Sequence, residues 1–427
     1  MTDQIPTIYE SAESLRKQGN YQPAAQAFEL LWKKSPSPSI GWRWAFSLRK
    51  MDSIAMAEKV IQEVIQKFPN DKFVISEFGW IQYFKDIKPG LDENNLGRII
   101  NAANKVWTYS PTDLLLAKLV LAVTKAAGKR GKWDIVLEWS GRVQADQLDS
   151  KATEYEGKPG MSDRELWYIR RSHAMLELSQ FNEARQFAHE GLKEFPNELY
   201  LSRNKALALA GSGDVAGGAA ELRQLLHHPR ADAYLKADLG ELEFQLGNLD
   251  EANRLLCEAV LNPQGDQYKL GYFLTMAEIN LAKGRPMAAA ESIALAKAVR
   301  QKEEWSIPAK LTHLEQETIE MLDAQGQVWP ELPQDIHSLS KLCAGHWKAE
   351  STIGLKRVTG RVGRIYPDKK HTFLERDDGE KSVFVLVRDL PKGCSEGTRV
   401  EFVLKPSFDR KKNEESMQAA DVKIIRT

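Results

Sequence analysis

A three-residue pattern returns at a fixed interval in this chain: a small residue, a polar residue and then an apolar residue. It occurs at 179–181, 213–215 and 247–249, so successive copies are 34 residues apart. A period of this length is typical of stacked helical hairpins. One hairpin cannot bury its own apolar face, so each must pack on its neighbours and extend a solenoid with a long concave surface. Surfaces of this kind usually bind other molecules.

Further units extend the array in both directions. Gly19 opens the same pattern in a first unit, a second unit runs from about 42 to 69, and Gly284 opens a later unit after three extra residues. The period is lost over 73–160, where Lys88-Pro89-Gly90 predicts the break of a helix. We expect a final helix over about 308–324 to cap the stack. The predicted solenoid therefore occupies 1–325, with an irregular middle.

Small residues recur inside the units as well. Ala184, Gly218 and Ala252 each lie five residues after the first residue of the turn, at a position where two helices must approach closely. The first residue of the turn is Gly or Ser, which tolerates a left-handed backbone conformation. These residues and spacings resemble the tetratricopeptide repeat, and the likeness covers roughly 5–325. The resemblance implies helix-turn-helix units that bind a protein partner. We expect His173, Arg203 and Glu241, on the inner helices, to line the binding groove.

Composition limits the class of protein. The 59 basic and 59 acidic residues balance, which argues against a chain that coats nucleic acid or a membrane along its whole length. The balance is uneven, because 356–427 holds 17 Lys and Arg against 12 Asp and Glu. Three widely spaced cysteines favour a reducing compartment, and the N-terminus lacks a basic segment followed by an apolar one. We expect a cytoplasmic protein without membrane association.

The periodicity changes near the C-terminus. Residues 326–355, with Pro330 and Pro333, are predicted to form a linker with at most one short helix. Beyond Gly354, apolar and polar residues alternate over 357–362, 382–387 and 399–404, with turns between them. Five short strands in about 70 residues predict a small all-β barrel over 356–427.

Several segments of this predicted barrel resemble a cold-shock domain in order and spacing. They are Gly360-Arg361-Val362, 368–374, Asp378-Gly379, Val383-Phe384-Val385, Glu396-Gly397 and 419–422. The resemblance implies an oligonucleotide-binding (OB) fold whose second and third strands present aromatic rings to single-stranded bases. By the same resemblance, Phe373 and His371 occupy the two aromatic positions of the first ribonucleoprotein motif, and Phe384 occupies that of the second.

Basic and aromatic residues near these rings complete the predicted nucleic-acid site. Lys369 would lie beside the phosphates, and Arg364 stands where a stacking Trp is usual in the family. Tyr366, Lys370 and Arg388 add further aromatic and phosphate contacts. Leu386 and Val387 replace the usual His and aromatic residue after the second motif. The alternative is that the two phenylalanines only pack, or that this face binds protein.

The sequence offers no catalytic or metal-binding constellation. His337, Cys343 and His346 are grouped, but no fourth ligand lies near them and the segment is a predicted linker. Residues 128–132 form a basic turn that lacks the Gly and the Lys-Ser or Lys-Thr of a phosphate-binding loop. We therefore expect no metal, no cofactor, no small-molecule substrate and no enzymatic activity.

Two functions from different classes are compatible with this organisation. In the first, the chain is an adaptor whose solenoid captures a protein while its barrel holds single-stranded RNA or DNA, with RNA favoured. In the second, it is a protein scaffold, or the regulatory subunit of an enzyme, and the barrel binds no nucleic acid. Phosphate contacts weaken steeply with salt, so the salt dependence of binding separates the two.

Overall fold

The computed structural model describes residues 4–152, 154–155, 158–228, 230–409, 412 and 414–425. The chain forms two compact units, Met1–Lys205 and Ala206–Thr427, whose boundary lies inside helix α12 (Leu199–Gly211). The helices are those of a solenoid of the tetratricopeptide type, followed by a five-stranded sheet. No helix in the described ranges is both long enough and apolar enough to span a membrane.

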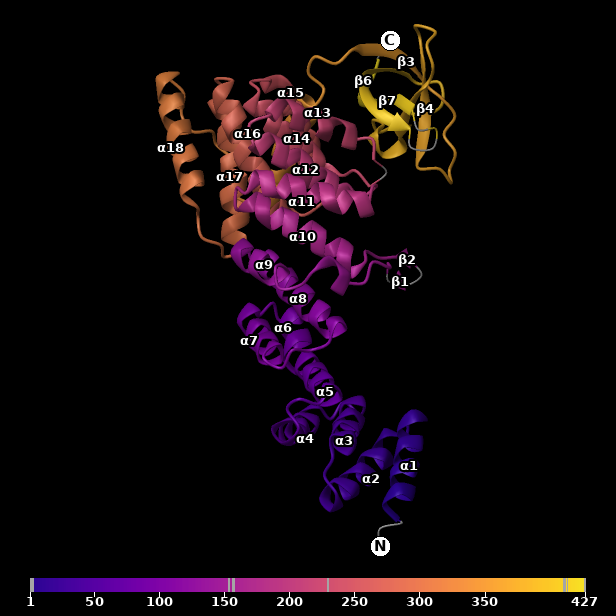
Figure 1. Cartoon of the computed structure of the whole chain (residues 1–427). Coiled ribbons are helices and arrows are strands. Elements are labelled where there is room, and N and C mark those ends of the chain that lie inside the picture. Colours follow the sequence, from indigo (N-terminus) through magenta and orange to yellow (C-terminus); the bar gives the residue numbers. More distant parts are fainter. Residues whose placement is uncertain are drawn as a thin grey trace. The chain divides into compact units, whose positions relative to one another are not determined.

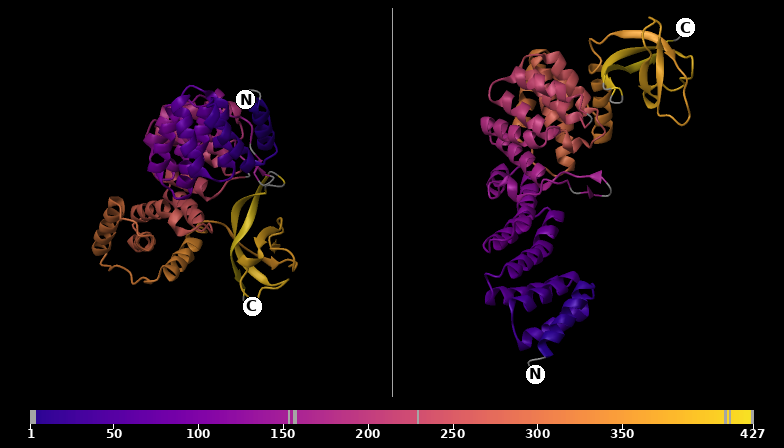
Figure 2. Two further views of the ribbon diagram at one scale, coloured as in Figure 1. Left: turned by 90° about the horizontal axis from the view of Figure 1, so that it is seen from below. Right: turned by 45° about the vertical axis from the view of Figure 1, so that its right-hand side comes forward.

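The first unit consists of antiparallel helical pairs stacked in chain order (Figures 1 and 2). Its helices are α1 (Gln4–Lys17), α2 (Tyr21–Lys34), α3 (Pro38–Lys50), α4 (Ile54–Lys67), α5 (Lys72–Gln82), α6 (Lys88–Asp92), α7 (Leu96–Trp107), α8 (Asp113–Gly128), α9 (Trp133–Ser140), α10 (Asp163–Glu177) and α11 (Phe181–Glu194). Strands β1 (Glu154–Tyr155) and β2 (Lys158–Pro159) form a small hairpin between α9 and α10. Each pair buries apolar residues such as Phe28 and Ile61 against its neighbours.

The predicted break at 88–90 is wrong. Helix α5 continues through a π-helical turn, Tyr83–Ile87, directly into α6. Pro89 lies in the first turn of α6 and has no N–H to donate, and the Lys85 carbonyl, four residues earlier, instead accepts a 2.9 Å hydrogen bond from Nη2 of Arg98 on α7. The wider π turn before it adjusts the hydrogen-bond ladder, so the chain remains helical across the proline.

The second unit begins with five further helices of the solenoid and two that follow them. They are α13 (Val215–Leu225), α14 (Ala233–Gln245), α15 (Leu249–Val260), α16 (Leu270–Ala282), α17 (Pro286–Lys302), α18 (Ala309–Ala324) and α19 (Ile336–Glu350). Helix α18 matches the expected capping helix at 308–324.

The turns between paired helices have the geometry that the repeat predicted. Gly213 and Gly247 have φ values of +111° and +80°, and Ser179, at the same position in its own repeat, has +58°. This left-handed region is strained for residues with a Cβ and open to glycine. The repeated small residue is therefore explained by the backbone of the turn.

Helix α19 lies within the stretch that we predicted as a linker, and it is packed rather than loose. Its buried residues Leu339, Cys343 and Trp347 are spaced four residues apart and so lie on one face. The Trp347 ring stacks on Phe273 of α16, with centroids 5.6 Å apart and planes inclined by 17°. The helical part of the unit therefore extends to Glu350, and the two prolines at 330 and 333 precede its last helix.

Five strands form the C-terminal sheet: β3 (Arg357–Val362), β4 (His371–Arg376), β5 (Val383–Leu386), β6 (Arg399–Asp409) and β7 (Glu414–Ile424). Their order is β3-β4-β5-β7-β6, and β6 pairs in turn with β3, so the sheet closes on itself. All neighbours are antiparallel except β5 and β7. Leu374, Val385 and Phe402 fill the interior.

A buried carboxylate on α15 links this sheet to the helices of the same unit. Glu258 lies 3.2 Å from the ammonium group of Lys405 on β6, and it also pairs with Lys236 at 2.5 Å and Arg254 at 2.7 Å. Its side chain is only 4% exposed. A carboxylate buried this deeply requires such cationic partners.

Candidate nucleic-acid interface

Three rings lie together on the outward face of β4 and β5. Strand alternation turns Thr372 and Leu374 into the interior, so His371 and Phe373 project outward from β4. Phe384 projects outward from β5, directly opposite Phe373 in the strand register. We call His371, Phe373 and Phe384 the aromatic face.

The three rings are in mutual contact. His371 stacks on Phe384 with centroids 5.3 Å apart and planes inclined by 28°. Phe373 meets each of the other two edge-on at 6.1 Å. Phe373 is 48% exposed. One flat ring is thus held by two others and remains accessible.

The connection between β3 and β4 brings basic groups to a second aromatic ring. The guanidinium of Arg364 lies 5.0 Å from the centroid of the Tyr366 ring, and the ammonium of Lys369 lies 4.5 Å from it. These are cation-π contacts. The Thr372 hydroxyl donates a hydrogen bond of 2.8 Å to the Arg364 carbonyl, which fixes the start of the connection against β4.

The two remaining residues of the predicted site lie near the ends of the same strands. Lys370 is exposed immediately before β4, and its carbonyl accepts a 3.0 Å hydrogen bond from the Val387 amide. Arg388 is exposed in the short 3-10 turn Val387–Asp389 that follows β5, 3.9 Å from Asp389. The sequence therefore identified residues that the fold gathers around β4 and β5.

Acidic groups occupy the opposite end of β4. The Asp377 carboxylate accepts hydrogen bonds from the Thr359 hydroxyl at 2.7 Å and from Arg399 at 3.3 Å. The Thr359 hydrogen bond is the main cause that lowers the pKa of Asp377, and the charges of Arg399 and Arg361 add to it. The carboxylate of the neighbouring Asp378 pairs with Arg376 and, at 3.8 Å, with Lys356, so the acidic groups at this end of the sheet are already paired with cations.

The structure places two of the three predicted groove residues in one pocket of the first unit. His173 on α10 and Arg203 on α12 line a cavity of about 340 Å³, together with Trp133, Arg170 and Asn204. Glu241, on α14 of the second unit, accepts a 3.3 Å hydrogen bond from the Thr275 hydroxyl. Arg170 and Trp133 were not predicted as site residues, because the cavity is built from several helices.

Burial changes the proton affinity of two groups in this pocket. Burial is the main cause that lowers the pKa of His173 to about 4, and the charge of Arg203 adds to it. The same desolvation lowers the pKa of Arg170 to about 10, opposed by the charge of Asp163. His173 is therefore a neutral imidazole at neutral pH, whereas Arg170 keeps its charge.

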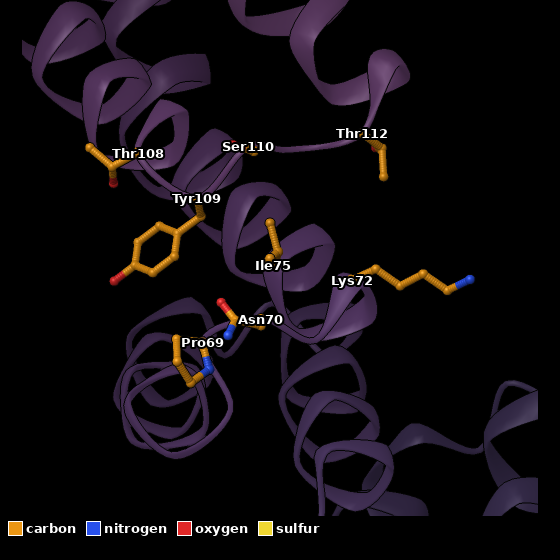
Figure 3. A pocket seen from close by; sticks show the side chains of 8 residues that line it. All are labelled: Pro69, Asn70, Lys72, Ile75, Thr108, Tyr109, Ser110 and Thr112. Carbon is orange, nitrogen blue, oxygen red and sulfur yellow. The ribbon is translucent and has the colours of Figure 1, made fainter.

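A larger cavity, about 580 Å³, lies beside the turns that precede α5 and α8 (Figure 3). Its lining residues are Pro69, Asn70, Lys72, Ile75, Thr108, Tyr109, Ser110 and Thr112. Among these lining residues, Lys72 and Tyr109 have ionisable side chains, and Figure 3 shows these two side chains extending in different directions. This lining does not bring reactive groups together.

The grouped residues near the end of the solenoid do not converge. Cys343 is buried in α19, and burial raises the pKa of its thiol to about 12. His346 is half exposed and lies 2.7 Å from the Glu291 carboxylate. In the part of the chain that the structure describes, no three His, Cys, Asp or Glu residues are arranged to hold a metal ion.

Comparison with solved structures finds other helical-repeat proteins at low identity. A tetratricopeptide repeat protein from Parabacteroides merdae is 9% identical, with 63% of this chain and 97% of that chain covered and a TM-score of 0.32. The C-terminal part of a repeat protein from Cytophaga hutchinsonii is 15% identical, with 64% and 95% covered and a TM-score of 0.32. The TPR2AB domain of yeast Sti1, in complex with pHSP90, is 12% identical, with 74% and 99% covered and a TM-score of 0.29.

No curated protein matches the sequence. One family does, and the match is local: residues 7–37 fit the tetratricopeptide repeat. These residues contain most of α1 and all of α2, with the left-handed Gly19 between them. The match to the tetratricopeptide repeat therefore covers the first helical pair of the chain.

Proposed function

We propose that this protein is a non-enzymatic adaptor. Its solenoid binds a protein partner, and its C-terminal sheet is an OB-fold of the cold-shock type that binds single-stranded nucleic acid, with RNA favoured. The observation that carries the nucleic-acid part is the exposed ring of Phe373, supported by His371 and Phe384 and bordered by basic residues.

The arrangement of strands supports an OB-fold. OB-folds are five-stranded barrels of the Greek-key type, and their ligands lie across the second and third strands. In this sheet the second and third strands are β4 and β5, the two that carry the aromatic face. The strand order and the position of the rings thus agree with one mode of binding.

The chemistry of the face suits single-stranded bases. Stacking of a base on an aromatic side chain contributes about 1 to 3 kcal/mol and tolerates any base, because every base has a π-face. Lys369 and Arg364 lie near Tyr366, so a strand that stacks on Phe373 and continues toward this tyrosine meets positive charge. Base stacking combined with phosphate neutralisation is the usual mode of single-strand binding.

The proposed protein-binding role rests on the repeat. Tetratricopeptide repeats form interaction surfaces, and this chain contains such a repeat in a long array of helical pairs. Joining two binding modules in one chain raises the effective concentration of one ligand near the other. An adaptor gains affinity in this way even when each module binds weakly.

Photo-crosslinking of the full chain to single-stranded RNA that contains 4-thiouridine tests the proposal. We expect the crosslinked peptides to contain Tyr366, Phe373 or Phe384. Phe402, which is fully buried inside the barrel, serves as an internal control and should not react. Crosslinks confined to the helices would contradict the proposed site and favour a scaffold whose sheet binds protein.

A further inference from the structure

The aromatic face continues across the sheet as a row of register partners. Phe373 on β4 lies opposite Phe384 on β5, and Phe384 lies opposite Gln418 on β7. Gln418 in turn lies opposite Lys405 on β6. Register partners project from the same side of a sheet, and neighbouring strands are about 4.8 Å apart. The row that begins with an exposed ring therefore ends at a cation, two strands beyond Phe384.

Strand alternation supports this orientation of Lys405 and Gln418. The residues next to them in the chain, Leu404 and Ala419, are also register partners, and both belong to the buried core of the sheet. Successive side chains of a strand point to opposite faces, so Lys405 and Gln418 project outward. Both are partly exposed.

Lys405 is at the same time paired with the helices of its unit. Its ammonium group lies 3.2 Å from the carboxylate of Glu258 on α15. Two cations of the helices contact the same carboxylate, Lys236 at 2.5 Å and Arg254 at 2.7 Å. Glu258 therefore stays paired when Lys405 leaves it, and the Lys405–Glu258 pair can open without exposing an uncompensated buried charge.

The closed pair carries a cost for Lys405. Burial is the main cause that lowers the pKa of Lys405, and the charge of Glu258 opposes this effect. The charges of Lys236 and Arg254 lower the pKa further. Three cations thus surround one carboxylate, and like charges repel one another. A second anion that pairs with Lys405 away from this cluster relieves the repulsion.

A single strand bound to the aromatic face is long enough to supply this anion. An OB-fold holds about 4 to 16 nucleotides. A strand that stacks on Phe373 and Phe384 therefore extends over the next two strands of the sheet. Gln418, the residue between the rings and Lys405 in the row, is neutral, so the row itself places no carboxylate in the path of the phosphates.

We propose that Lys405 is a nucleic-acid contact as well as a bridge to the solenoid: a phosphate of the bound strand pairs with Lys405 in place of Glu258 and so loosens the sheet from the helices. The inference rests on the proposed binding of single-stranded nucleic acid by the sheet and couples that binding to the helical part of the same unit. A ligand shifts an equilibrium between two states only when it binds one of them better. The open state offers the strand one more cation, so binding favours opening.

Fluorescence anisotropy of a labelled single-stranded RNA of about 12 nucleotides with the full chain tests the coupling. The variants are Lys405→Gln, Glu258→Gln and the two combined. The matched control is Glu251→Gln, which removes the same charge from the same helix, where Glu251 pairs with Arg254 at 2.5 Å. Circular dichroism verifies that all variants remain folded.

We expect Glu258→Gln to tighten RNA binding by up to about fivefold, because Lys405 no longer has to leave a carboxylate. Lys405→Gln should weaken binding by a similar factor. It should also reduce the slope of log affinity against log salt by about 0.7, the value of one phosphate contact of a single strand. In the Lys405→Gln background, Glu258→Gln should have no effect, because the two residues act through one pair. Glu251→Gln should bind as the unchanged protein does.

Energy transfer provides a second readout, which remains informative if Glu258→Gln fails to fold. All tryptophans of the chain precede residue 348, whereas Cys394 lies between the strands of the sheet and is only partly buried. A dye on Cys394 therefore accepts energy only from tryptophans of the helices. We expect the transfer to fall when RNA is added to the labelled protein, and to be low before RNA is added in Lys405→Gln.

Several outcomes overturn the coupling. They are equal tightening by Glu258→Gln and Glu251→Gln, tightening that persists without Lys405, and energy transfer that RNA does not change. If Phe373→Ala/Phe384→Ala still abolishes RNA binding in these cases, the proposed nucleic-acid function stands and only the coupling is wrong. Absence of RNA binding by the unchanged protein overturns both.

Discussion

His371 and Phe384 stack across neighbouring strands, with ring centroids 5.3 Å apart. An imidazole here completes the support of the exposed Phe373 ring, which it meets edge-on. We therefore expect His371→Ala to weaken binding of single-stranded RNA about five- to tenfold, at the lower end of the energy of one stacking contact. His371→Phe, which restores a ring, should bind at least as well as the unchanged protein in a filter-binding assay. Equal weakening by both substitutions would contradict a stacking role.

Arg49 and Glu77 form a buried ion pair between α3 and α5, with two hydrogen bonds of 2.6 and 2.9 Å. Removing one partner leaves a buried charge, so Arg49→Met should destabilise the fold by about 3 to 5 kcal/mol. Replacing both residues, in Arg49→Met/Glu77→Leu, should recover most of this loss. The urea midpoint of unfolding measures both effects. A double variant no more stable than the single one would show that the pair acts through packing.

The left-handed turns predict that replacing their glycine by alanine lowers the stability of the fold. Gly247 has φ of +80° and nothing within 4 Å of where a Cβ would lie, so the backbone conformation alone opposes a side chain. We expect Gly247→Ala to lower stability by about 1 kcal/mol or somewhat more. Gly271, on α16, has similarly open space without positive φ and provides the control, since Gly271→Ala should stabilise its helix. Thermal unfolding distinguishes the two.

The three thiols should differ in reactivity. Burial raises the pKa of both Cys257 and Cys343 to about 12, whereas Cys394 is only partly buried. Thiolate is the reactive form of cysteine. The two buried residues are therefore protected from a thiol reagent by their raised pKa as well as by their burial. A thiol reagent such as Ellman's should label Cys394 in the native protein and all three after denaturation. Loss of native labelling in Cys394→Ser verifies the assignment.

Acid should weaken the fold through His173. Its pKa is lowered from 6.5 to about 4, chiefly by burial, so the unfolded chain takes up this proton before the folded one does. The stabilising effect of its neutral form is fully present above about pH 6.5 and is lost as the pH falls toward 4. For a side chain that is 30% exposed, the loss amounts to roughly 2 kcal/mol. Urea unfolding of His173→Gln at both ends of this range should show a smaller pH dependence than that of the unchanged protein.

Much of the fold follows from local patterns. The period of 34 residues predicted the paired helices because each turn needs a small residue at one left-handed position, as at Gly213 and Gly247. The alternation over 357–362 predicted β3 to the residue, because a strand with one buried face must alternate. The shared outward face of Phe373 and Phe384 was implied by the resemblance to cold-shock domains, and in the structure the two residues are register partners on β4 and β5.

The features that the sequence did not predict depend on contacts between residues far apart in the chain, or on a local change of helix geometry that accommodates a proline. Pro89 suggested a break, but the π turn before it keeps the chain helical. The prolines before α19 suggested a linker, yet the packing of Trp347 on Phe273 stabilises a helix there. The pocket around Arg170 draws residues from four helices, and no single segment contains its pattern.

The central claim is that the aromatic face binds single-stranded nucleic acid. Fluorescence anisotropy of labelled RNA and DNA strands of about 12 nucleotides, with the full chain at low and moderate salt, tests it most directly. We predict salt-sensitive binding that Phe373→Ala/Phe384→Ala abolishes, while Phe73→Ala, which removes a half-exposed ring on α5, leaves it unchanged. Absence of binding, or binding that the double substitution does not affect, would contradict the account and leave the sheet as a protein-binding module.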